Sequence, residues 1–439
     1  MRVSVFGGGY VGVVVAVGLA ESGNDVLCVD TDARRVDALK AGRLPFHEPG
    51  VGELLERNLR EGRLEFDTDA SRAVGHGLVI FVCVGTPSLP DGACDLGAVW
   101  KVAETVAREA DGYRVLVLKS TVPVGTAAKV KELMRGVAAH PFAVVSNPEF
   151  MKEGAALEDF MSPSRVVIGT DDARAGGILE RLYAPFLRVS RRIYRMDNTS
   201  AEMVKYASNC FLAMKISFIN EIANICERTG ADVNPVRLAV GADPRIGPHF
   251  LFPGVGYGGS CLPKDVRALI HVAQGDGYEP LMLIATDEVN RRQRLVLLRR
   301  AEARFGADIR ATRAAVWGLS FKPRTDDVRE APSLDLIEGL LARGVDVTAF
   351  DPVASGSAAR VLGDRVRFAE NMYAALDGAD MLFLVTEWQE FRRPDLERMR
   401  DLMRTPVVFD GRNIWNAREM EEAGFEYFCI GRGVGGRGR

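Results

Sequence analysis

The sequence has little that would support a metal site, a disulfide framework or a membrane span. Its five histidines are scattered without the spacing of metal ligands, and its seven cysteines include no Cys-x-x-Cys pair. The odd cysteine count and mostly apolar surroundings favour reduced thiols in a cytoplasmic protein. No apolar run reaches the roughly 20 residues of a membrane-spanning helix. The net charge of −3 favours neither nucleic acid nor an anionic membrane, so we expect no metal, no membrane and no nucleic-acid partner.

The composition is that of a globular protein with more than one core. With 439 residues, of which 47% are hydrophobic and 26% charged, the chain is long enough for two or three domains. Its last residues, 431–439, are glycine and arginine apart from Val434. Glycine-rich ends without apolar side chains do not pack, and we expect a flexible tail.

The first thirty residues carry the pattern of a dinucleotide site. Residues 2–6 read as a strand, Gly7-Gly8-Gly9-Tyr10-Val11-Gly12 has the GxGxxG spacing, and residues 13–22 read as a helix. A second predicted strand, 25–29, is followed by Asp30 at the distance expected for a ribose-binding carboxylate. The glycines would let a pyrophosphate approach the helix N-terminus.

This pattern predicts the first cofactor contacts. They are the loop residues Gly7, Gly9, Tyr10, Val11 and Gly12. Asp30 would accept a hydrogen bond from the ribose 2′-hydroxyl and repel a 2′-phosphate, which favours NAD over NADP. Arg34 and Arg35 keep NADP open, because arginines can pair with that phosphate.

Polar residues follow three further predicted strands, 77–84, 114–119 and 142–146. They are Thr86, Ser120, Thr121, Asn147, Glu149 and Glu153. Ligands of parallel sheets bind beyond the carboxyl ends of the strands, so these side chains are candidate ligand contacts. The alternative is that they only build turns and helix caps.

Residues 198–228 contain no proline or glycine and repeat their apolar residues at helical spacing. Thr199 or Ser200 would cap this long helix, which is also a candidate dimer interface. Lys205 and Asn209 lie one turn apart, so they share a face. Together they would stabilise an oxyanion, unless Lys205 only extends from a partly buried stem. A second long helix is predicted over 281–304.

A glycine-rich stretch, 256–265, contains Cys261 beside Lys264 and Asp265. Both signs of charge near a thiol favour a reactive cysteine, although a single cysteine is more often a small buried hydrophobe. The last third again alternates strands (314–319, 345–350, 379–385, 406–410) with a helix from 333 to 343, without GxGxxG. A loop with Lys322, Arg324 and Arg329 takes its place, either as a phosphate-binding loop or as a solvated one.

These motifs occur in the order of the UDP-glucose/GDP-mannose dehydrogenase family, which the chain resembles up to about residue 430. The resemblance also rests on Lys119-Ser120-Thr121-Val122-Pro123-Val124-Gly125, Asn147-Pro148-Glu149-Phe150 and Gly258-Gly259-Ser260-Cys261-Leu262-Pro263-Lys264-Asp265. It implies an α/β fold of two Rossmann-like, doubly wound domains joined by a long central helix. The implied domains are 1–197 for NAD, 198–307 for dimerisation and the catalytic cysteine, and 308–430 for the UDP-sugar, before the tail 431–439.

The resemblance implies a role for individual residues. The catalytic positions are Cys261, Lys205, Asn209, Asp265, Glu149 and Thr121. The cofactor contacts beyond the glycine loop are Asp30, Arg35, Thr86, Ser120, Thr121, Glu153, Lys264 and Arg329. The substrate contacts are Glu149, Phe150, Lys205, Asn209, Arg245, Phe250, Phe252, Gly254, Tyr257, Gly258 and Lys322, with Arg245 acting across a homodimer.

The implied reaction is the NAD-dependent, four-electron oxidation of UDP-glucose at C6, through a thiohemiacetal and a thioester on Cys261. Leu262 and the pair Met151-Lys152 depart from the pattern of the UDP-glucose-oxidising members, which keeps GDP-mannose, UDP-galactose and UDP-N-acetyl sugars open as substrates. A two-electron dehydrogenase of the β-hydroxyacid type would not need the cysteine loop or a second nucleotide-binding half. A regulator that binds nucleotide sugars without catalysis would not need the four predicted catalytic residues Lys205, Asn209, Cys261 and Asp265.

Overall fold

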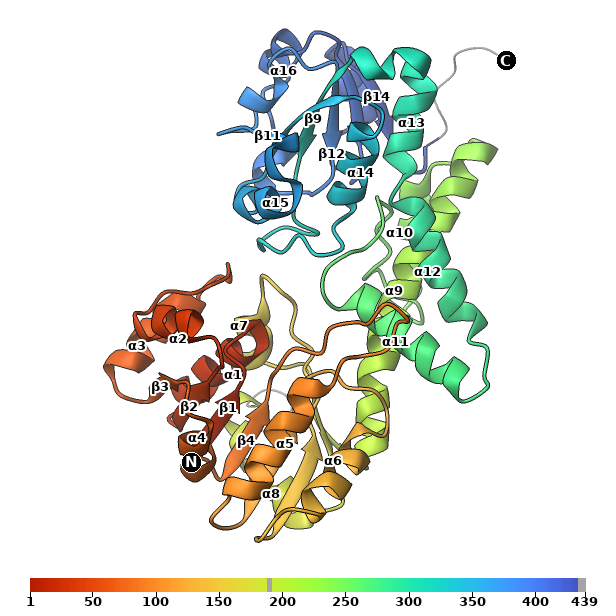
Figure 1. Ribbon diagram of the computed structural model, residues 1–439. Coiled ribbons are helices and arrows are strands. Elements are labelled where there is room, and N and C mark those ends of the chain that lie inside the picture. Colours follow the sequence, from red (N-terminus) through yellow and green to blue (C-terminus); the bar gives the residue numbers. More distant parts are fainter. Residues whose placement is uncertain (188–191, 433–439) are drawn as a thin grey trace. The chain divides into compact units, whose positions relative to one another are not determined.

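The computed structural model describes residues 1–187 and 192–432 (Figure 1). These residues form two compact units, Met1–Ser208 with Ala268–Tyr278 and Asn209–Arg267 with Glu279–Arg439. Among the described residues, no helix is both long and apolar enough to cross a membrane. Most of the predicted tail, 433–439, lies outside the described residues, whereas Gly431 donates its N–H to Glu227.

The first unit contains a sheet of eight strands within the described residues, in the order β3-β2-β1-β4-β5-β6-β7-β8. The strands are β1 (Arg2–Phe6), β2 (Asp25–Val29), β3 (Leu64–Asp67), β4 (Val79–Val82), β5 (Arg114–Leu118), β6 (Phe142–Ser146), β7 (Val166–Gly169) and β8 (Ile193–Met196). All neighbouring pairs are parallel except β6 with β7. The first six strands have the 3-2-1-4-5-6 order of dinucleotide-binding folds, which confirms the first Rossmann-like half.

Helices cover both faces of this sheet. They are α1 (Tyr10–Glu21), α2 (Ala33–Lys40), α3 (Val51–Arg60), α4 (Ala70–His76), α5 (Gly97–Glu109), α6 (Thr126–Arg135), α7 (Ala156–Met161), α8 (Ala173–Tyr183) and the 3₁₀ turn η1 (Ala184–Phe186). Alternate strand residues pack on α1, α3, α7 and α8 in one core and on α4, α5 and α6 in another. Because the central strands are buried on both faces, they read as continuous apolar runs.

Helix α9 (Asn198–Thr229) has 32 residues and is therefore about 48 Å long. Its cap is Asp197 rather than the predicted Thr199 or Ser200, since Asp197 Oδ1 accepts the Ser200 N–H at 2.8 Å. Glu202 is buried near its start and accepts the N–H groups of Gly125 and Ala127, both at 2.7 Å. The carboxylate thereby caps α6 and fixes the first turns of α9 to the sheet.

After α9 come α10 (Val233–Gly241), α11 (Leu262–Gly275), α12 (Leu281–Gln293) and α13 (Val296–Phe305). They belong to the second unit except for the part of α11 from Ala268 onward, which belongs to the first. The single helix predicted over 281–304 is therefore two helices, broken at Arg294 and Leu295. No proline or glycine marks the break. Arg294 turns there to pair with Glu330 and Asp335, so a non-local contact accompanies the change of direction.

A second sheet has six described strands in the order β11-β10-β9-β12-β13-β14, all parallel. The strands are β9 (Arg313–Trp317), β10 (Asp346–Phe350), β11 (Arg367–Phe368), β12 (Met381–Leu384), β13 (Val407–Asp410) and β14 (Glu426–Cys429). Its helices are α14 (Pro332–Leu341), α15 (Ser355–Leu362), α16 (Leu396–Leu402) and α17 (Ala417–Glu422), with 3₁₀ turns η2 (Gly306–Ala311), η3 (Gly363–Arg365), η4 (Ala374–Leu376) and η5 (Gln389–Arg392). The order repeats 3-2-1-4-5-6, which confirms the second Rossmann-like half.

Candidate active site

The glycine loop between β1 and α1 has the shape of a dinucleotide cradle. A Cβ added to Gly12 would lie 1.8 Å from the Gly7 carbonyl oxygen, and one added to Gly7 would lie 2.6 Å from the Cys83 carbonyl oxygen. Gly9 precedes α1, and a Cβ there would meet nothing within 4 Å. The loop is therefore closed on its protein side and open above the helix N-terminus, where unpaired N–H groups attract a pyrophosphate. These features fit NAD.

Asp30 lies after β2, as predicted, and also holds the cradle together. Its Oδ2 accepts the Gly8 N–H at 2.7 Å and Arg35 Nη1 at 2.9 Å, and its Oδ1 accepts the Asp32 N–H at 2.9 Å. Because Arg35 pairs with Asp30, its charge is partly neutralised. This pairing disfavours a 2′-phosphate and favours NAD.

The hydroxyls at the strand ends fasten neighbouring loops. Thr86 Oγ1 donates to the Thr121 carbonyl at 2.8 Å, and Ser120 Oγ donates to the Val84 carbonyl at 2.7 Å. The loops after β4 and β5 are thus joined at the carboxyl edge of the sheet. Both residues have the turn-building role that sequence reasoning left open.

Glu48 is a buried carboxylate that sequence reasoning missed. It accepts the N–H groups of Gly154 at 2.6 Å and Ala156 at 2.8 Å, and also the Tyr10 hydroxyl. Glu48 therefore fixes the segment that contains Glu153. The pKa of Tyr10 is raised by burial, then by Glu48, and to a smaller extent by the charge of Glu153. No local pattern marks Glu48, because its N–H partners lie more than a hundred residues away.

The central pair of the first unit is Glu149 and Lys205. Lys205 Nζ donates to Glu149 Oε1 at 2.6 Å and to the Glu149 carbonyl at 2.8 Å, and both side chains are buried. Burial by itself would raise the pKa of Glu149, but the charge and hydrogen bond of Lys205 outweigh it and hold the pKa below its ordinary value. Since the ammonium is buried, Lys205 does not merely extend to solvent. The arrangement is a held cation beside an ionised carboxylate.

A second buried lysine, Lys119, stands near this pair. It donates to Asn147 Oδ1 and to the Tyr183 hydroxyl, both at 3.1 Å, and lines a cavity with Asn147, Glu149, Phe150 and Tyr183. Burial, opposed by Glu149, lowers the pKa of Lys119 to about 8. In the sequence, Lys119 ends an apolar strand and begins a motif of the family resemblance, but sequence reasoning gave it no role of its own.

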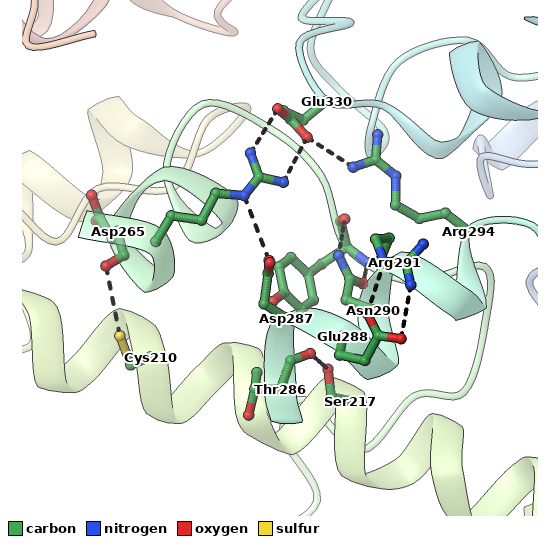
Figure 2. A network of polar contacts seen from close by, with 12 residues as sticks. Cys210, Ser217, Asp265, Thr286, Asp287, Glu288, Asn290, Arg291, Arg294 and Glu330 are labelled. Carbon is green, nitrogen blue, oxygen red and sulfur yellow. Dashed lines mark hydrogen bonds and ion pairs between the residues drawn. The ribbon is translucent and has the colours of Figure 1, made fainter. Parts of the chain in front are cut away.

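In the second unit, Asp265 is held between an amide and an ammonium. Asn209 Nδ2 donates to Asp265 Oδ2 at 2.6 Å, and Lys264 Nζ lies 2.8 Å from Asp265 Oδ1. Asp265 is buried in the first turn of α11. Figure 2 shows Cys210 beside it on α9. Burial, together with the Asp265 charge, raises the pKa of the Cys210 thiol to about 12, so Cys210 stays protonated.

Cys261 differs from Cys210 in exposure and position. Of the seven cysteines, Cys94 and Cys261 are partly exposed and the others are buried. Cys261 directly precedes α11, and its carbonyl accepts the Asp265 N–H at 2.9 Å. The start of a helix stabilises an anion, so the location suits a thiolate.

The glycines before Cys261 serve close packing inside the second unit. An added Cβ would lie 2.0 Å from the Glu330 carbonyl oxygen at Gly258, 2.7 Å from the Phe321 ring at Gly259, and 2.6 Å from Asn290 Oδ1 at Gly256. Their backbone packs against other protein segments, which leaves no room for side chains at these positions.

Two buried amides on α12, which sequence reasoning missed, hold this loop. Asn290 Oδ1 accepts the Tyr257 N–H at 2.8 Å, and Asn290 Nδ2 donates to the Tyr257 carbonyl at 3.1 Å. Gln293 Nε2 donates to the Gly254 carbonyl at 2.6 Å. The Tyr257 side chain is only 5% exposed, so this predicted substrate contact is largely enclosed by protein.

The other predicted contacts of the second unit lie at or near its surface. Phe252 is exposed, and Phe250 has a positive φ of 66°. Arg245 forms an ion pair with Asp243 at 2.6 Å while remaining exposed. In the loop between β9 and α14, Lys322 lies over the Phe321 ring and Arg329 pairs with Asp327. These cations therefore stand where a phosphorylated ligand from solvent can reach them.

Three profiles of one family match the chain in order. The NAD binding domain of the UDP-glucose/GDP-mannose dehydrogenase family matches residues 1–187, its central domain matches residues 199–292, and its UDP binding domain matches residues 315–417. A UDP-glucose 6-dehydrogenase from Pseudomonas aeruginosa is 48% identical over 442 residues and covers 98% of each chain.

Solved structures match the whole chain as well. A UDP-glucose dehydrogenase from the hyperthermophilic archaeon Pyrobaculum islandicum has a TM-score of 0.91 at 40% identity, covering 99% of this chain and 98% of that one. A UDP-D-ManNAc dehydrogenase from Pyrococcus horikoshii has a TM-score of 0.86 at 28% identity, covering 99% of this chain and 100% of that one. The fold and the order of the domains are thus those of nucleotide-sugar dehydrogenases.

Proposed function

Because the chain belongs to the UDP-glucose/GDP-mannose dehydrogenase family, we propose that it oxidises UDP-glucose to UDP-glucuronate with NAD. The observation that carries this proposal is a partly exposed Cys261 at the start of α11, followed by an Asp265 that is held by Asn209. A cysteine nucleophile suits the oxidation of an alcohol through the aldehyde level to a carboxylate. GDP-mannose and other UDP-hexoses are the alternative substrates.

We propose that the cofactor contacts predicted from the sequence hold NAD. They are Gly7, Gly9, Tyr10, Val11, Gly12, Asp30, Arg35, Thr86, Ser120, Thr121, Glu153, Lys264 and Arg329. When bound, NAD supplies the two-electron oxidant for each of the two oxidations. The glycines position the pyrophosphate at the N-terminus of α1, and Asp30 accepts from the ribose.

The UDP-sugar is proposed to contact Glu149, Phe150, Lys205, Asn209, Arg245, Phe250, Phe252, Gly254, Tyr257, Gly258 and Lys322. Gly254, Tyr257 and Gly258 would contribute backbone groups, since the loop leaves little room for side chains and Tyr257 is buried. Lys322 would supply charge to the diphosphate. Lys205, held by Glu149, would stabilise the C6 oxyanion of the first step.

The second oxidation is proposed to proceed on Cys261. Its thiolate adds to the C6 aldehyde and gives a thiohemiacetal, whose oxidation yields a thioester. Lys205 and Asn209 would donate to the oxygen at C6. Water then attacks the thioester carbon, the C–S bond breaks, and the carboxylate leaves while Cys261 is regenerated. The carboxylates of Glu149 and Asp265 and the Thr121 hydroxyl would orient this water, and one of the two carboxylates would take its proton.

The reaction is tested by its stoichiometry. Purified protein incubated with limiting UDP-glucose and excess NAD is expected to form two NADH per sugar, measured by absorbance, with UDP-glucuronate as the product. One NADH and free aldehyde would indicate a two-electron dehydrogenase, and no NADH with any nucleotide sugar would indicate a binding protein. GDP-mannose, UDP-galactose and UDP-N-acetyl sugars in the same assay decide the substrate.

Replacing Cys261 by serine isolates the second step. We expect Cys261→Ser to bind NAD normally but to lose at least about a thousandfold in turnover, because an alkoxide nucleophile is not available at neutral pH and its ester hydrolyses slowly. Cys94→Ser, which changes the other partly exposed thiol, is the control and should turn over like the parent. Full turnover by Cys261→Ser would remove Cys261 from this role.

We propose that the protein is a homodimer formed through α9. Phe211, Phe218 and Ile225 lie seven residues apart on this helix and are 57%, 49% and 49% exposed. Such an apolar stripe is costly in water and fits a second copy. Arg245, which is exposed, would reach the substrate of the partner subunit.

We also propose that the protein works in the cytoplasm. The seven cysteines, all within the described residues, form no disulfide, and the proposed reaction needs Cys261 reduced. Fractionation of cells that express the protein, with detection by antibody, checks the location.

A further inference from the structure

Two loops of the second unit are joined backbone to backbone. They are the 318–331 loop, between β9 and α14, and the cysteine loop, residues 254–261. The Gly259 N–H donates to the Arg329 carbonyl at 2.9 Å, and a Cβ on Gly258 would lie 2.0 Å from the Glu330 carbonyl oxygen. The approach is so close that neither loop can shift here without moving the other.

Glu330 occupies the centre of this junction. Its φ is +51°, a left-handed conformation that costs a residue with a side chain about 1 kcal/mol or more. Its carboxylate accepts from Arg267 Nη1 at 3.1 Å and from Arg294 Nη1 at 2.8 Å, and Figure 2 shows it reaching Arg294. The two ion pairs hold the carboxylate in place.

The arginines belong to the elements that carry and brace Cys261. Arg267 lies on α11, which starts directly after Cys261, and Arg294 follows α12, whose Asn290 holds the cysteine loop. A helix moves as a rigid element, so a pull on Arg267 is transmitted to Cys261 at its start. The other end of the connection, the 318–331 loop, carries Lys322 and Arg329.

We propose that Glu330 is a positioning residue that couples nucleotide occupancy of the 318–331 loop to the placement of Cys261. The inference rests on the proposed function, because it assigns UDP to that loop and the nucleophile to Cys261. A bound diphosphate draws the 318–331 loop toward itself, and Glu330 carries the displacement through Arg267 to α11. The sulfur is thereby set for attack only when a nucleotide is present.

The test measures the alkylation of Cys261 by iodoacetamide in the full chain, quantified by peptide mass spectrometry, with and without UDP. UDP lacks the sugar and so leaves the C6 position empty. We expect UDP to change the wild-type rate about fivefold or more. We expect the Glu330→Gln variant to bind UDP with the wild-type affinity, measured by calorimetry. Its rate of Cys261 alkylation should, however, be the same with and without UDP.

Matched variants separate this coupling from general damage. Glu288→Gln removes ion pairs to Arg291 and Arg292 on α12 and should respond to UDP like the wild type. Arg267→Gln cuts the connection on the α11 side and should lose the response as Glu330→Gln does, which provides the test if Glu330→Gln does not fold. Arg267 and Arg294 also contact Asp287 and Asp335, so they keep a partner without Glu330.

Two results would overturn the coupling: a wild-type rate that ignores UDP, or a folded Glu330→Gln that retains the full response. Turnover gives a second readout, since a lost coupling lowers kcat for UDP-glucose more than it raises KM. The alkylation assay needs no turnover. A wild type that responds to UDP but makes no NADH from UDP-glucose would therefore refute the reaction and leave the coupling standing.

Discussion

At the residue scale, the same side chain takes opposite roles according to its surroundings. Burial, and then the charge of Asp265, raises the pKa of the Cys210 thiol to about 12. Cys261, in contrast, is partly exposed at a helix start. Lys205 and Lys119 are both buried near Glu149, but Lys205 pairs with its carboxylate and Lys119 bonds neutral partners. Burial disfavours the charged form of Lys119 and lowers its pKa to about 8, against the opposing charge of Glu149.

Lys119 therefore gives stability a specific pH dependence. The folded chain holds this proton only up to its pKa of about 8, and the unfolded chain up to about 10.5. Because the unfolded state binds more protons between these values, stability rises with pH across the window. Relative to Lys119→Met, the wild type should gain about 2 kcal/mol of unfolding free energy between about pH 7 and about pH 9.5, measured by urea denaturation.

A lysine that is paired with an exposed carboxylate supplies the control for this measurement. Lys131 forms an ion pair with the exposed Asp171, and Lys131→Met should show no comparable gain over the same pH range. In Lys119→Met the Tyr183 hydroxyl still donates to Asn147 Oδ1 at 2.6 Å, so no buried group loses its last partner. If the difference in unfolding free energy between wild type and Lys119→Met did not change with pH, the pKa of Lys119 would not be lowered in the folded chain.

At the element scale, the protein uses one topology twice with different loops after the first strand. The β1–α1 loop is a glycine cradle closed by Asp30, whose Oδ2 accepts the Gly8 N–H. In the second sheet, Asp351 follows the second strand in the same way, and its Oδ2 accepts from Leu319 N, Ser320 N and Trp388 Nε1. Its Oδ1 also accepts the N–H groups of Val353 and Ala354, so the buried Asp351 shapes its own loop.

Two glycines of the cradle, Gly9 and Gly12, should differ in how they tolerate replacement by alanine. Gly12→Ala would place a Cβ 1.8 Å from the Gly7 carbonyl, which we expect to cost about 1–3 kcal/mol of stability and most NAD binding. In Gly9→Ala the added methyl group meets no protein atom within 4 Å, so the melting temperature should stay at the parental value. The affinity for NAD should fall, because the methyl group would occupy the side of the loop on which NAD is proposed to bind. Calorimetric NAD titration and thermal melts check both, and a Gly9→Ala variant that binds NAD normally would contradict the placement of the pyrophosphate.

At the scale of the whole molecule, two Rossmann-like halves are built on one continuous helix, α9 (Figure 1). Each half has its own hydrophobic cores. The apolar stripe of α9 remains exposed in a single chain, which is the physical reason to expect a second copy.

Replacing Phe218 by aspartate tests the homodimer. A charge in the middle of an apolar interface loses its hydration, so Phe218→Asp should weaken association by about a hundredfold or more and give monomers in light scattering. Val361→Asp on α15 removes a similarly exposed apolar side chain (55%) outside the stripe and should leave the mass unchanged. A wild type that is already monomeric would refute the proposal.

The sequence by itself determined the α/β class, both Rossmann-like halves, the length of α9, and the glycine motif with Asp30. These features are encoded by periodicity and turn residues that act between near neighbours in the chain. Only the tertiary structure decided that Glu48, Lys119, Asn290 and Glu330 matter, that one predicted helix is two, and that the glycines before Cys261 pack against protein. A buried charge or a close backbone approach depends on partners far along the chain, so its meaning appears only when the fold brings them together.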